Sequence, residues 1–202
     1  MTKPMITRFP IDPHVGAFIV GVVSDTHIPD RVSGLHPALL QALRIAKTNL
    51  IFHLGDICAP WVLKQLSTVS PVLAVRGNRD WLFWGALPWQ REVEIFGTIV
   101  SLQHGQGTFW QYWSGKLFHV TTGYQVDQYL PRLIQSSSRA KVLLFGHTHF
   151  PECFTWENRL VMNPGSASVG SPRQKKPTFG VLTFQPDGNI TGRIEVLEQE
   201  EP

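Results

Sequence analysis

The chain contains little cysteine and few charged residues. Cys58 and Cys153 are its two cysteines, and charged residues make up 16% of its 202 positions, against 43% for hydrophobic residues. Two cysteines do not form the disulfide framework that stabilises small secreted domains, and this apolar content argues against a disordered chain. We therefore expect a compact globular protein in a reducing compartment.

Long hydrophobic runs are also missing. No stretch approaches the roughly 18 consecutive apolar residues of a membrane-spanning helix, and residues 1–17 lack the apolar region of a secretory signal. The length fits one domain that buries roughly 70% of its unfolded surface. The sequence thus predicts a loose N-terminal arm over residues 1–17 and a single domain over residues 18–202. It also predicts a cytoplasmic location and no membrane partner.

Neither sign of charge dominates the chain. Eighteen basic residues against fifteen acidic residues give a formal net charge of +3, and the basic residues are dispersed except for a cluster at residues 173–176. We interpret this cluster as a solvated loop, with electrostatic steering of an anionic substrate as the alternative. A nucleic-acid partner is not expected.

Apolar runs and helical spacing alternate over the first eighty residues. Strands are predicted over residues 18–23, 50–54 and 72–75, with helices over residues 37–47 and 60–66 between them. This βαβαβ order predicts parallel strands covered by helices. The remaining predicted strands include a hairpin and an all-β tail: residues 92–96, 99–102, 141–145, 153–156, 160–162, 178–184 and 190–197. Together they predict two mixed sheets packed face to face, with helices on the outer faces.

Metal-ligand residues follow most of these apolar runs. They occur in six short stretches: Asp25-Thr26-His27, Gly55-Asp56, Gly77-Asn78-Arg79-Asp80, His104-Gly105, Gly146-His147-Thr148-His149 and Asn163-Pro164-Gly165-Ser166. Carboxylate, amide and imidazole groups together suit manganese, iron, zinc or cobalt. Two such ions about 3.5–4 Å apart supply the nucleophile and the counter-charge that hydrolysis of a phosphate ester requires. The six stretches together predict a two-metal hydrolytic site.

Each stretch taken alone has a simpler interpretation. Asp25 or Asp56 could cap the N-terminus of a helix. His147 and His149 alternate along the chain, so on a regular strand they would leave opposite faces, and their convergence requires a loop. The other histidines are interpreted as structural or exposed: His14, His36, His53 and His119.

The order of the motifs resembles a known family. Asp-x-His, Gly-Asp, Gly-Asn, His-Gly and Gly-His-x-His follow one another as in the calcineurin-like metallophosphoesterase superfamily, and the Asn163-Pro164-Gly165-Ser166 ending is similar to its small YfcE-type bacterial and archaeal branch. The resemblance covers most of residues 18–184. It implies an α/β/β/α sandwich with the site at the strand ends.

The resemblance also implies a role for each motif residue. Two divalent ions are expected, manganese first, with iron, zinc, cobalt or nickel as alternatives. Their implied ligands are Asp25, His27 and His149 for the first ion, Asn78, His104 and His147 for the second, and Asp56 between the two. Asp56, Asn78 and His104 are the implied catalytic residues, and Asn78 and Arg79 the implied substrate-binding residues.

Arg79 departs from the pattern of many relatives. Phosphomonoesterases of this superfamily carry a histidine there that protonates the leaving oxygen, held by an adjacent acid, whereas arginine stays protonated and is a poor general acid. Arg79 is expected to form a salt bridge with Asp80 or to bind a phosphoryl oxygen. Phosphodiester hydrolysis by a metal-bridging hydroxide is therefore the leading hypothesis. The expected substrate is a small phosphate ester, with a nucleotide-like ester as one candidate. The alternatives are a phosphomonoesterase or nucleotidase, and a non-catalytic binding scaffold with the same fold.

Tryptophan gathers beside two of the site loops. Five of the seven tryptophans lie at residues 81–89 and 109–113. Such side chains stack on substrate bases, form subunit contacts or pack in cores, so a homodimer is one expectation. Residues 105–124 are interpreted as a lid, an interface or part of the core.

Overall fold

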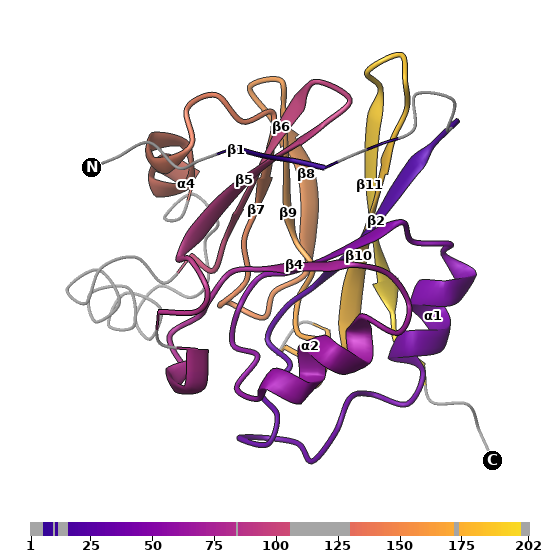
Figure 1. Cartoon of the computed structure of the whole chain (residues 1–202), viewed down its shortest axis with the longest axis vertical. Coiled ribbons are helices and arrows are strands. Elements are labelled where there is room, and N and C mark those ends of the chain that lie inside the picture. Colours follow the sequence, from indigo (N-terminus) through magenta and orange to yellow (C-terminus); the bar gives the residue numbers. More distant parts are fainter. Residues whose placement is uncertain are drawn as a thin grey trace.

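The computed structural model describes residues 6–9, 11, 16–83, 85–105, 130–171 and 174–198. Two β-sheets lie against each other across this part of the chain, with helices outside them (Figure 1). Within these ranges, no helix has both the length and the apolar character needed to cross a membrane.

One sheet has five strands and carries the N-terminal βαβαβ unit. Strands β2, β3 and β4 are parallel, whereas β10 is antiparallel to both of its neighbours. The order across the sheet is β11 (Ile190–Val196), β10 (Thr178–Phe184), β2 (Phe18–Val23), β3 (Leu50–His53) and β4 (Val72–Ala74). The predicted parallel unit is confirmed.

The second sheet has six strands and is also mixed. Its hairpin of β5 and β6 is antiparallel, while β7 runs parallel to both β6 and β9. The order is β1 (Ile6–Arg8), β5 (Gln90–Ile95), β6 (Thr98–Gln103), β7 (Val142–Leu144), β9 (Arg159–Asn163) and β8 (Glu152–Trp156). Both sheets therefore combine parallel and antiparallel pairs, as the sequence predicts.

The main core lies between the two sheets. Val20 and Val22 of β2 are fully buried in the same apolar cluster as Val100 of β6 and Val142 of β7. Val23, the residue after Val22, belongs to a second cluster with the helices on the other face, because side chains alternate between the two faces of a strand. The two sheets thus share one apolar interior.

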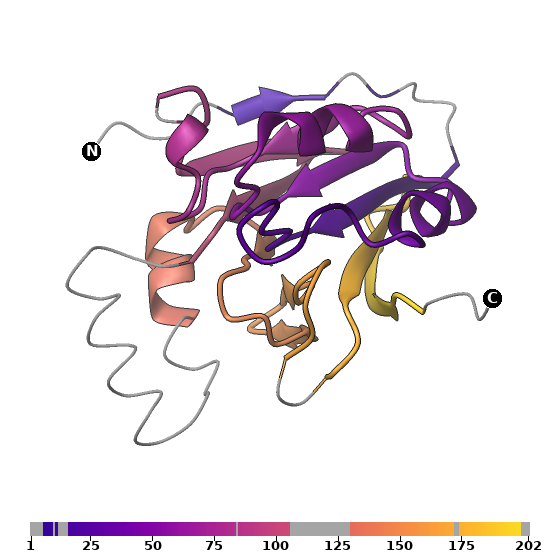
Figure 2. The same cartoon turned by 90° about the horizontal axis from the view of Figure 1, so that it is seen from below.

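Helices cover both outer faces. α1 (Leu39–Ile45) and α2 (Pro60–Leu66) pack on the five-stranded sheet, and α4 (Leu130–Ser136) packs on the six-stranded sheet. Pro60 occupies the first turn of α2, where its missing N–H has no intrahelical partner to lose. Figure 2 shows α1 and α4 on opposite sides of the molecule. The predicted α/β/β/α sandwich is confirmed.

Two expectations differ from the structure. The arm over residues 1–17 is not loose throughout, because Ile6–Arg8 form β1 and pair in parallel with β5. The helix predicted over residues 37–47 is confined to Leu39–Ile45. Residues 105–124, interpreted as a lid, an interface or part of the core, lie outside the described residues apart from Gly105.

Candidate metal centre

The predicted ligands sit on loops at the ends of five strands. Asp25, Asp56 and Asn78 come after β2, β3 and β4 of the five-stranded sheet. His104 follows β6 of the other sheet, and His147 and His149 follow β7. Because parallel strands end at the same edge of a sheet, the two sheets deliver these side chains to one place.

Most of these ligands share an unusual backbone conformation. Five of the seven have a positive φ, between 49° and 69°: Asp25, His27, Asp56, His147 and His149. Residues other than glycine rarely adopt this conformation, and it concentrates at functional sites. His147 and His149 lie on a loop and not on a regular strand. Their side chains can therefore converge, although the two residues alternate along the chain.

Asp25 lies at the centre of the cluster. Its Oδ2 accepts hydrogen bonds from the Ser24 hydroxyl at 2.6 Å and from the His147 backbone N–H at 3.0 Å. Its Oδ1 accepts no hydrogen bond within the described part of the chain. That oxygen lies 3.3 Å from His149 Nε2 and 3.6 Å from His27 Nε2. A carboxylate oxygen buried among imidazole nitrogens is arranged as a metal ligand.

Asp56 faces histidines that come from both sheets. Its Oδ1 accepts the backbone N–H of Arg79 at 2.9 Å and lies 3.3 Å from His104 Nε2. Its Oδ2 lies 3.9 Å from His27 Nδ1. The two oxygens therefore point toward histidines from different sheets, which is the placement that a bridging carboxylate requires.

The ring of His104 is oriented by the backbone. Its Nδ1 donates a hydrogen bond to the Leu54 carbonyl at 2.7 Å, which leaves Nε2 to face the carboxylates, as in metal-binding histidines. Burial opposes charge on this ring, but Asp56 and Asp25 outweigh burial and raise its pKa to about 9. In the metal-free protein a proton on His104 therefore offsets part of the carboxylate charge.

Two other histidines of the cluster, His27 and His147, favour the neutral form. Burial lowers the pKa of His27 and of His147 to about 4. His27 Nε2 lies 3.0 Å from His149 Nε2, and the rings of His104 and His147 are 5.1 Å apart. Neutral imidazoles that converge in this way are competent ligands.

The two carboxylates remain ionised. Burial would raise the pKa of Asp25, but the surrounding imidazoles of His104, His149 and His27 hold it well below its usual range. The pKa of Asp56 is also lowered, because His104 outweighs the effect of burial. Two buried carboxylates thus lie among imidazole nitrogens that can bind metal.

The residues present fit divalent metal ions. The potential ligand atoms of Asp25, His27 and His149 lie within 4.8 Å of one another, and so do those of Asp25, Asp56 and His104. Asn78 Oδ1 and His104 Nε2 are buried and have no hydrogen-bond partner among the described residues. Buried polar atoms normally have partners, so the unpaired Asn78 Oδ1, and His104 Nε2 once it loses its proton, are suited to binding a cation.

Asp80 joins two of the ligand loops through their backbones. Its Oδ1 accepts the N–H groups of Ile57 and Cys58, both at 2.7 Å, and its Oδ2 accepts that of Gly77 at 2.6 Å. Gly77 is needed here, because a Cβ atom at that position would lie 2.2 Å from Asp56 Oδ1. Asp80 therefore holds the Asp56 loop against the Asn78 loop.

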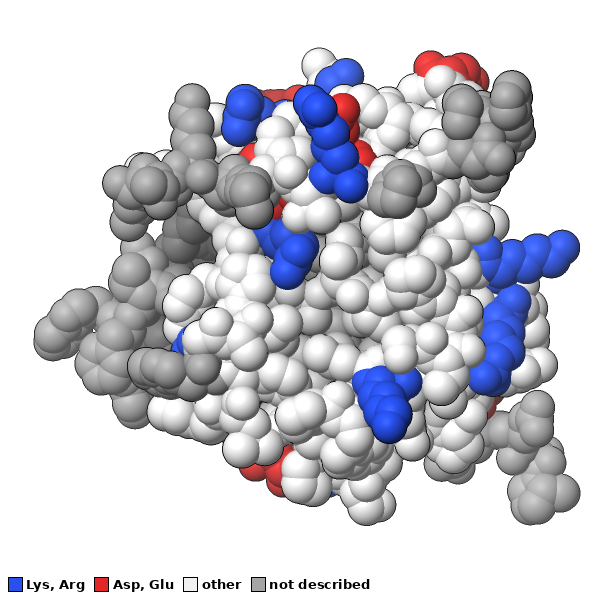
Figure 3. Space-filling model, in the orientation of Figure 1, with Lys and Arg blue, Asp and Glu red and all other residues white. Residues whose placement is uncertain are grey.

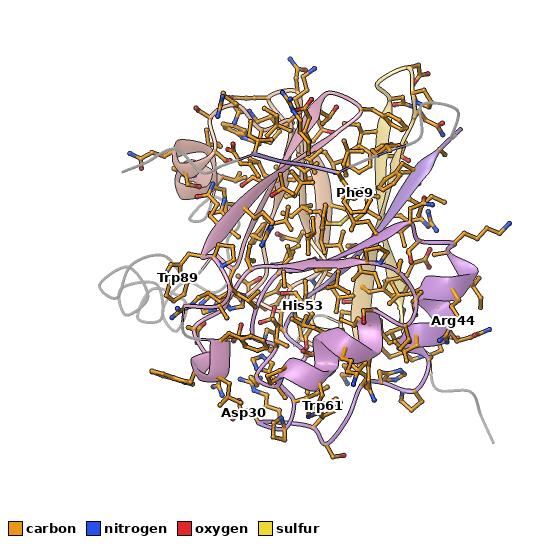
Figure 4. All side chains as sticks on the ribbon, in the orientation of Figure 1. Phe9, Asp30, Arg44, His53, Trp61 and Trp89 are labelled. Carbon is orange, nitrogen blue, oxygen red and sulfur yellow. The ribbon has the colours of Figure 1, made fainter. Side chains whose placement is uncertain are left out.

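The predicted salt bridge between Arg79 and Asp80 is wrong. The Arg79 guanidinium pairs with the carboxylate of Asp30 instead, because three backbone amides already engage Asp80. Figure 4 shows Asp30 at the lower edge of the molecule, near α2. The sequence analysis did not identify Asp30, which lies in a loop without a motif of its own.

The stretch at residues 163–166 supports the ligand loops. Asn163 Nδ2 donates to the Gly146 carbonyl at 3.0 Å and to the Thr148 hydroxyl at 2.9 Å. The Ser166 hydroxyl donates to the Asp25 carbonyl at 2.8 Å. This stretch therefore holds the backbone of two ligand loops, a role that the motif alone did not reveal.

His53 is a buried structural histidine, as predicted. Its Nδ1 accepts the Gly55 N–H at 3.2 Å, which leaves Nε2–H to donate to the Thr26 hydroxyl at 3.2 Å. His36 is half-buried, and its Nδ1 accepts the Ala38 N–H. His14 and His119 lie outside the described residues.

Two of the tryptophans beside the site loops are exposed at the surface. Trp81 and Trp89 are 73% and 53% exposed, and Arg76 lies 3.8 Å from the centre of the Trp89 ring. Lys176 of the basic cluster pairs with Glu198, which weakens the steering hypothesis. Figure 3 shows lysine and arginine side chains dispersed over one face of the molecule. The segment at residues 109–113 and Trp84 lie outside the described residues.

Comparisons with known proteins agree with this geometry. A family model described as a calcineurin-like phosphoesterase superfamily domain matches residues 18–187. A probable metallophosphoesterase of Methanothermobacter thermautotrophicus is 37% identical over 164 residues, covering 81% of this chain and 84% of that protein. Another, from Methanocaldococcus jannaschii, is 30% identical and covers 91% of this chain and 84% of the relative.

The fold is also similar to solved structures. Vacuolar protein sorting 29 from Cryptosporidium parvum matches with a TM-score of 0.68 at 20% identity, over 92% of this chain and all of the other. At this identity the likeness concerns the fold alone. With the family model spanning most of the sequence, the chain belongs to the calcineurin-like phosphoesterase superfamily.

Proposed function

We propose that this protein hydrolyses phosphodiesters with the aid of two divalent metal ions. Asp25, His27 and His149 would hold one ion, and Asn78, His104 and His147 the other, with Asp56 between them. The main support is that two groups of potential ligand residues share Asp25. One group adds His27 and His149 and the other adds Asp56 and His104, and within each group the ligand atoms lie within 4.8 Å of one another. The ions would supply an activated water and a counter-charge for the phosphoryl group.

Two features of the chain support a diester over a monoester. Arg79 occupies the position after Asn78, and a guanidinium does not act as a general acid near neutral pH. Its side chain is engaged by Asp30. Substrates whose leaving group needs little protonation would therefore be preferred. We propose manganese as the first metal to test, because a mixed set of carboxylate and imidazole ligands suits it. The same set also suits iron, zinc, cobalt or nickel, which are the alternatives.

The test compares two chromogenic esters. Metal-stripped protein is supplied with Mn²⁺ and assayed on bis-p-nitrophenyl phosphate and on p-nitrophenyl phosphate. We expect metal-dependent turnover of the diester, and a loss in Asp56→Asn larger than the roughly 10–100-fold typical of changes outside the ligand set. Asp187→Asn, the same change in an exposed turn, serves as the control and should retain full activity.

Other results would favour the alternatives. A preference for the monoester would favour a phosphomonoesterase or nucleotidase. An absence of metal-dependent turnover of either ester would favour a binding scaffold, which the similarity in fold to vacuolar protein sorting 29 keeps as the second candidate.

A further inference from the structure

Asp30 lies at the rim of the candidate metal centre. Its carboxylate Oδ2 is 3.9 Å from His27 Nδ1, and its side chain is 40% exposed. The potential metal-ligand atoms of His27, Asp30 and Cys58 lie within 4.8 Å of one another. A negative charge therefore stands beside the first proposed metal position, where solvent still reaches it.

Asp30 also positions the Arg79 guanidinium. The backbone N–H of Arg79 donates to Asp56 at 2.9 Å, so Arg79 is anchored to the proposed bridging carboxylate. Its guanidinium turns toward Asp30 and pairs with it. The ion pair therefore connects the loop after β2 with the loop after β4, across the edge of the site.

We propose that Asp30 determines the charge selectivity of the site. This inference depends on the proposed function. The Asp30 carboxylate holds Arg79 away from the phosphoryl group and offsets its positive charge, so the ion pair as a whole does not attract a second negative charge on the substrate. Asp30 thus favours a phosphodiester, which carries one negative charge, over a phosphomonoester.

The charge difference between these substrates is large near neutral pH. A phosphomonoester has a second pKa of about 6 and carries about −1.5 to −2 charges at pH 7. Its attraction to an Arg79 guanidinium without a carboxylate partner would therefore be up to twice that of a diester. Arg79 could bind phosphoryl oxygens through two parallel N–H groups if it were free, and that contact would favour the more highly charged ester. Pairing with Asp30 removes this contact, so both effects of Asp30 act in the same direction.

The experiment uses the Mn²⁺-loaded full-length protein. The ratio of kcat/KM for p-nitrophenyl phosphate to that for bis-p-nitrophenyl phosphate is measured for the wild type, Asp30→Asn, Asp30→Glu and Arg79→Gln. We expect Asp30→Asn to raise the ratio roughly two- to fivefold, the range for partly exposed charges. Asp30→Glu keeps the charge and should keep the ratio, whereas Arg79→Gln should lower it.

Salt distinguishes charge selectivity from a structural effect. The increase in Asp30→Asn should shrink as ionic strength rises, because exposed charges are screened. The thermal midpoint of this variant should match that of the wild type, and both esters are assayed at Mn²⁺ concentrations that saturate each variant. An equal loss of activity on both esters would overturn the inference by giving Asp30 a purely structural role.

The two proposals fail in different ways. Diester turnover in the wild type together with an unchanged ratio in Asp30→Asn would overturn only the role of Asp30. An absence of metal-dependent turnover in the wild type would overturn the proposed function and the role of Asp30 with it.

Discussion

Histidines in this protein are tuned in opposite directions by their surroundings. His104 faces two carboxylates and has a raised pKa, whereas burial lowers the pKa of His53 to about 3. His53 contacts backbone and hydroxyl groups and has no proposed metal to hold. Burial is the largest cause of its shifted pKa, so it reports mainly how burial couples to stability.

His53 makes the stability of the metal-free protein depend on pH. The unfolded chain binds a proton at this histidine as pH falls below 6.5, while the folded protein does not until about pH 3. Stability is therefore lost as pH falls, by about 2 kcal/mol between pH 7 and 5. We expect His53→Asn, which keeps an acceptor for Gly55 N–H, to remove this part of the loss in urea unfolding with chelator present.

His36 offers a matched control for this prediction. Its Nδ1 also accepts an N–H two residues further along the chain, from Ala38, but the ring is only half-buried. His36→Asn should therefore change the pH dependence of unfolding much less than His53→Asn. An equal effect of the two substitutions would contradict the assignment to burial.

Individual residues were predictable from the sequence to different degrees. Asp25, Asp56 and His104 could be named as candidate ligands because each follows an apolar strand within a short motif, and the structure brings their side chains together. The partner of Arg79 could not be named, since Asp30 is 49 positions away in the sequence and an exposed charge carries no sign of its partner. The same holds for Asp80, whose three partners are backbone amides.

At the scale of elements, the approach of α1 to its sheet depends on one glycine. A Cβ atom on Gly21 of β2 would lie 2.5 Å from Leu43 Cδ2 of α1 and 3.1 Å from Thr48 Cγ2. Leu43 is fully buried and has little room to move. The missing side chain therefore lets the helix pack closely on the outer face of the sheet.

Gly21→Ala should destabilise the protein by about 1–2 kcal/mol, the lower part of the range for overpacked cores. The measurement is the free energy of unfolding in urea. Gly34→Ala is the control, since a Cβ atom there would meet nothing within 4 Å, and it should change stability by less than about 0.5 kcal/mol. A stable Gly21→Ala protein would show that α1 can shift without cost.

The sequence predicted the elements with a clear period better than those that depend on distant partners. The bounds of β2, α2 and β10 agree with the sequence expectation, because apolar runs and turn residues mark both of their ends. β1 was missed, since its three residues form a strand only by pairing with β5, which lies more than eighty positions further along. Local pattern carries no information about such a pairing.

At the scale of the molecule, the candidate metal centre joins the two sheets. Asp25, Asp56 and Asn78 belong to loops of the five-stranded sheet, while His104, His147 and His149 belong to loops of the six-stranded sheet. Ions held between these loops would connect the two layers at their strand ends. The sandwich should therefore gain stability as a whole when metal binds.

We expect Mn²⁺ to raise the thermal midpoint of the metal-stripped protein, because a ligand that binds only the folded state stabilises it by about 2.7 kcal/mol at a concentration a hundredfold above its Kd. Asp56→Asn should lose most of this gain, since Asp56 faces His104 of one sheet and His27 of the other. Asp187→Asn, in the turn between β10 and β11, should keep it. Calorimetric scans with and without Mn²⁺ measure the difference, and a midpoint that does not respond to any divalent metal would contradict a centre that links the two sheets.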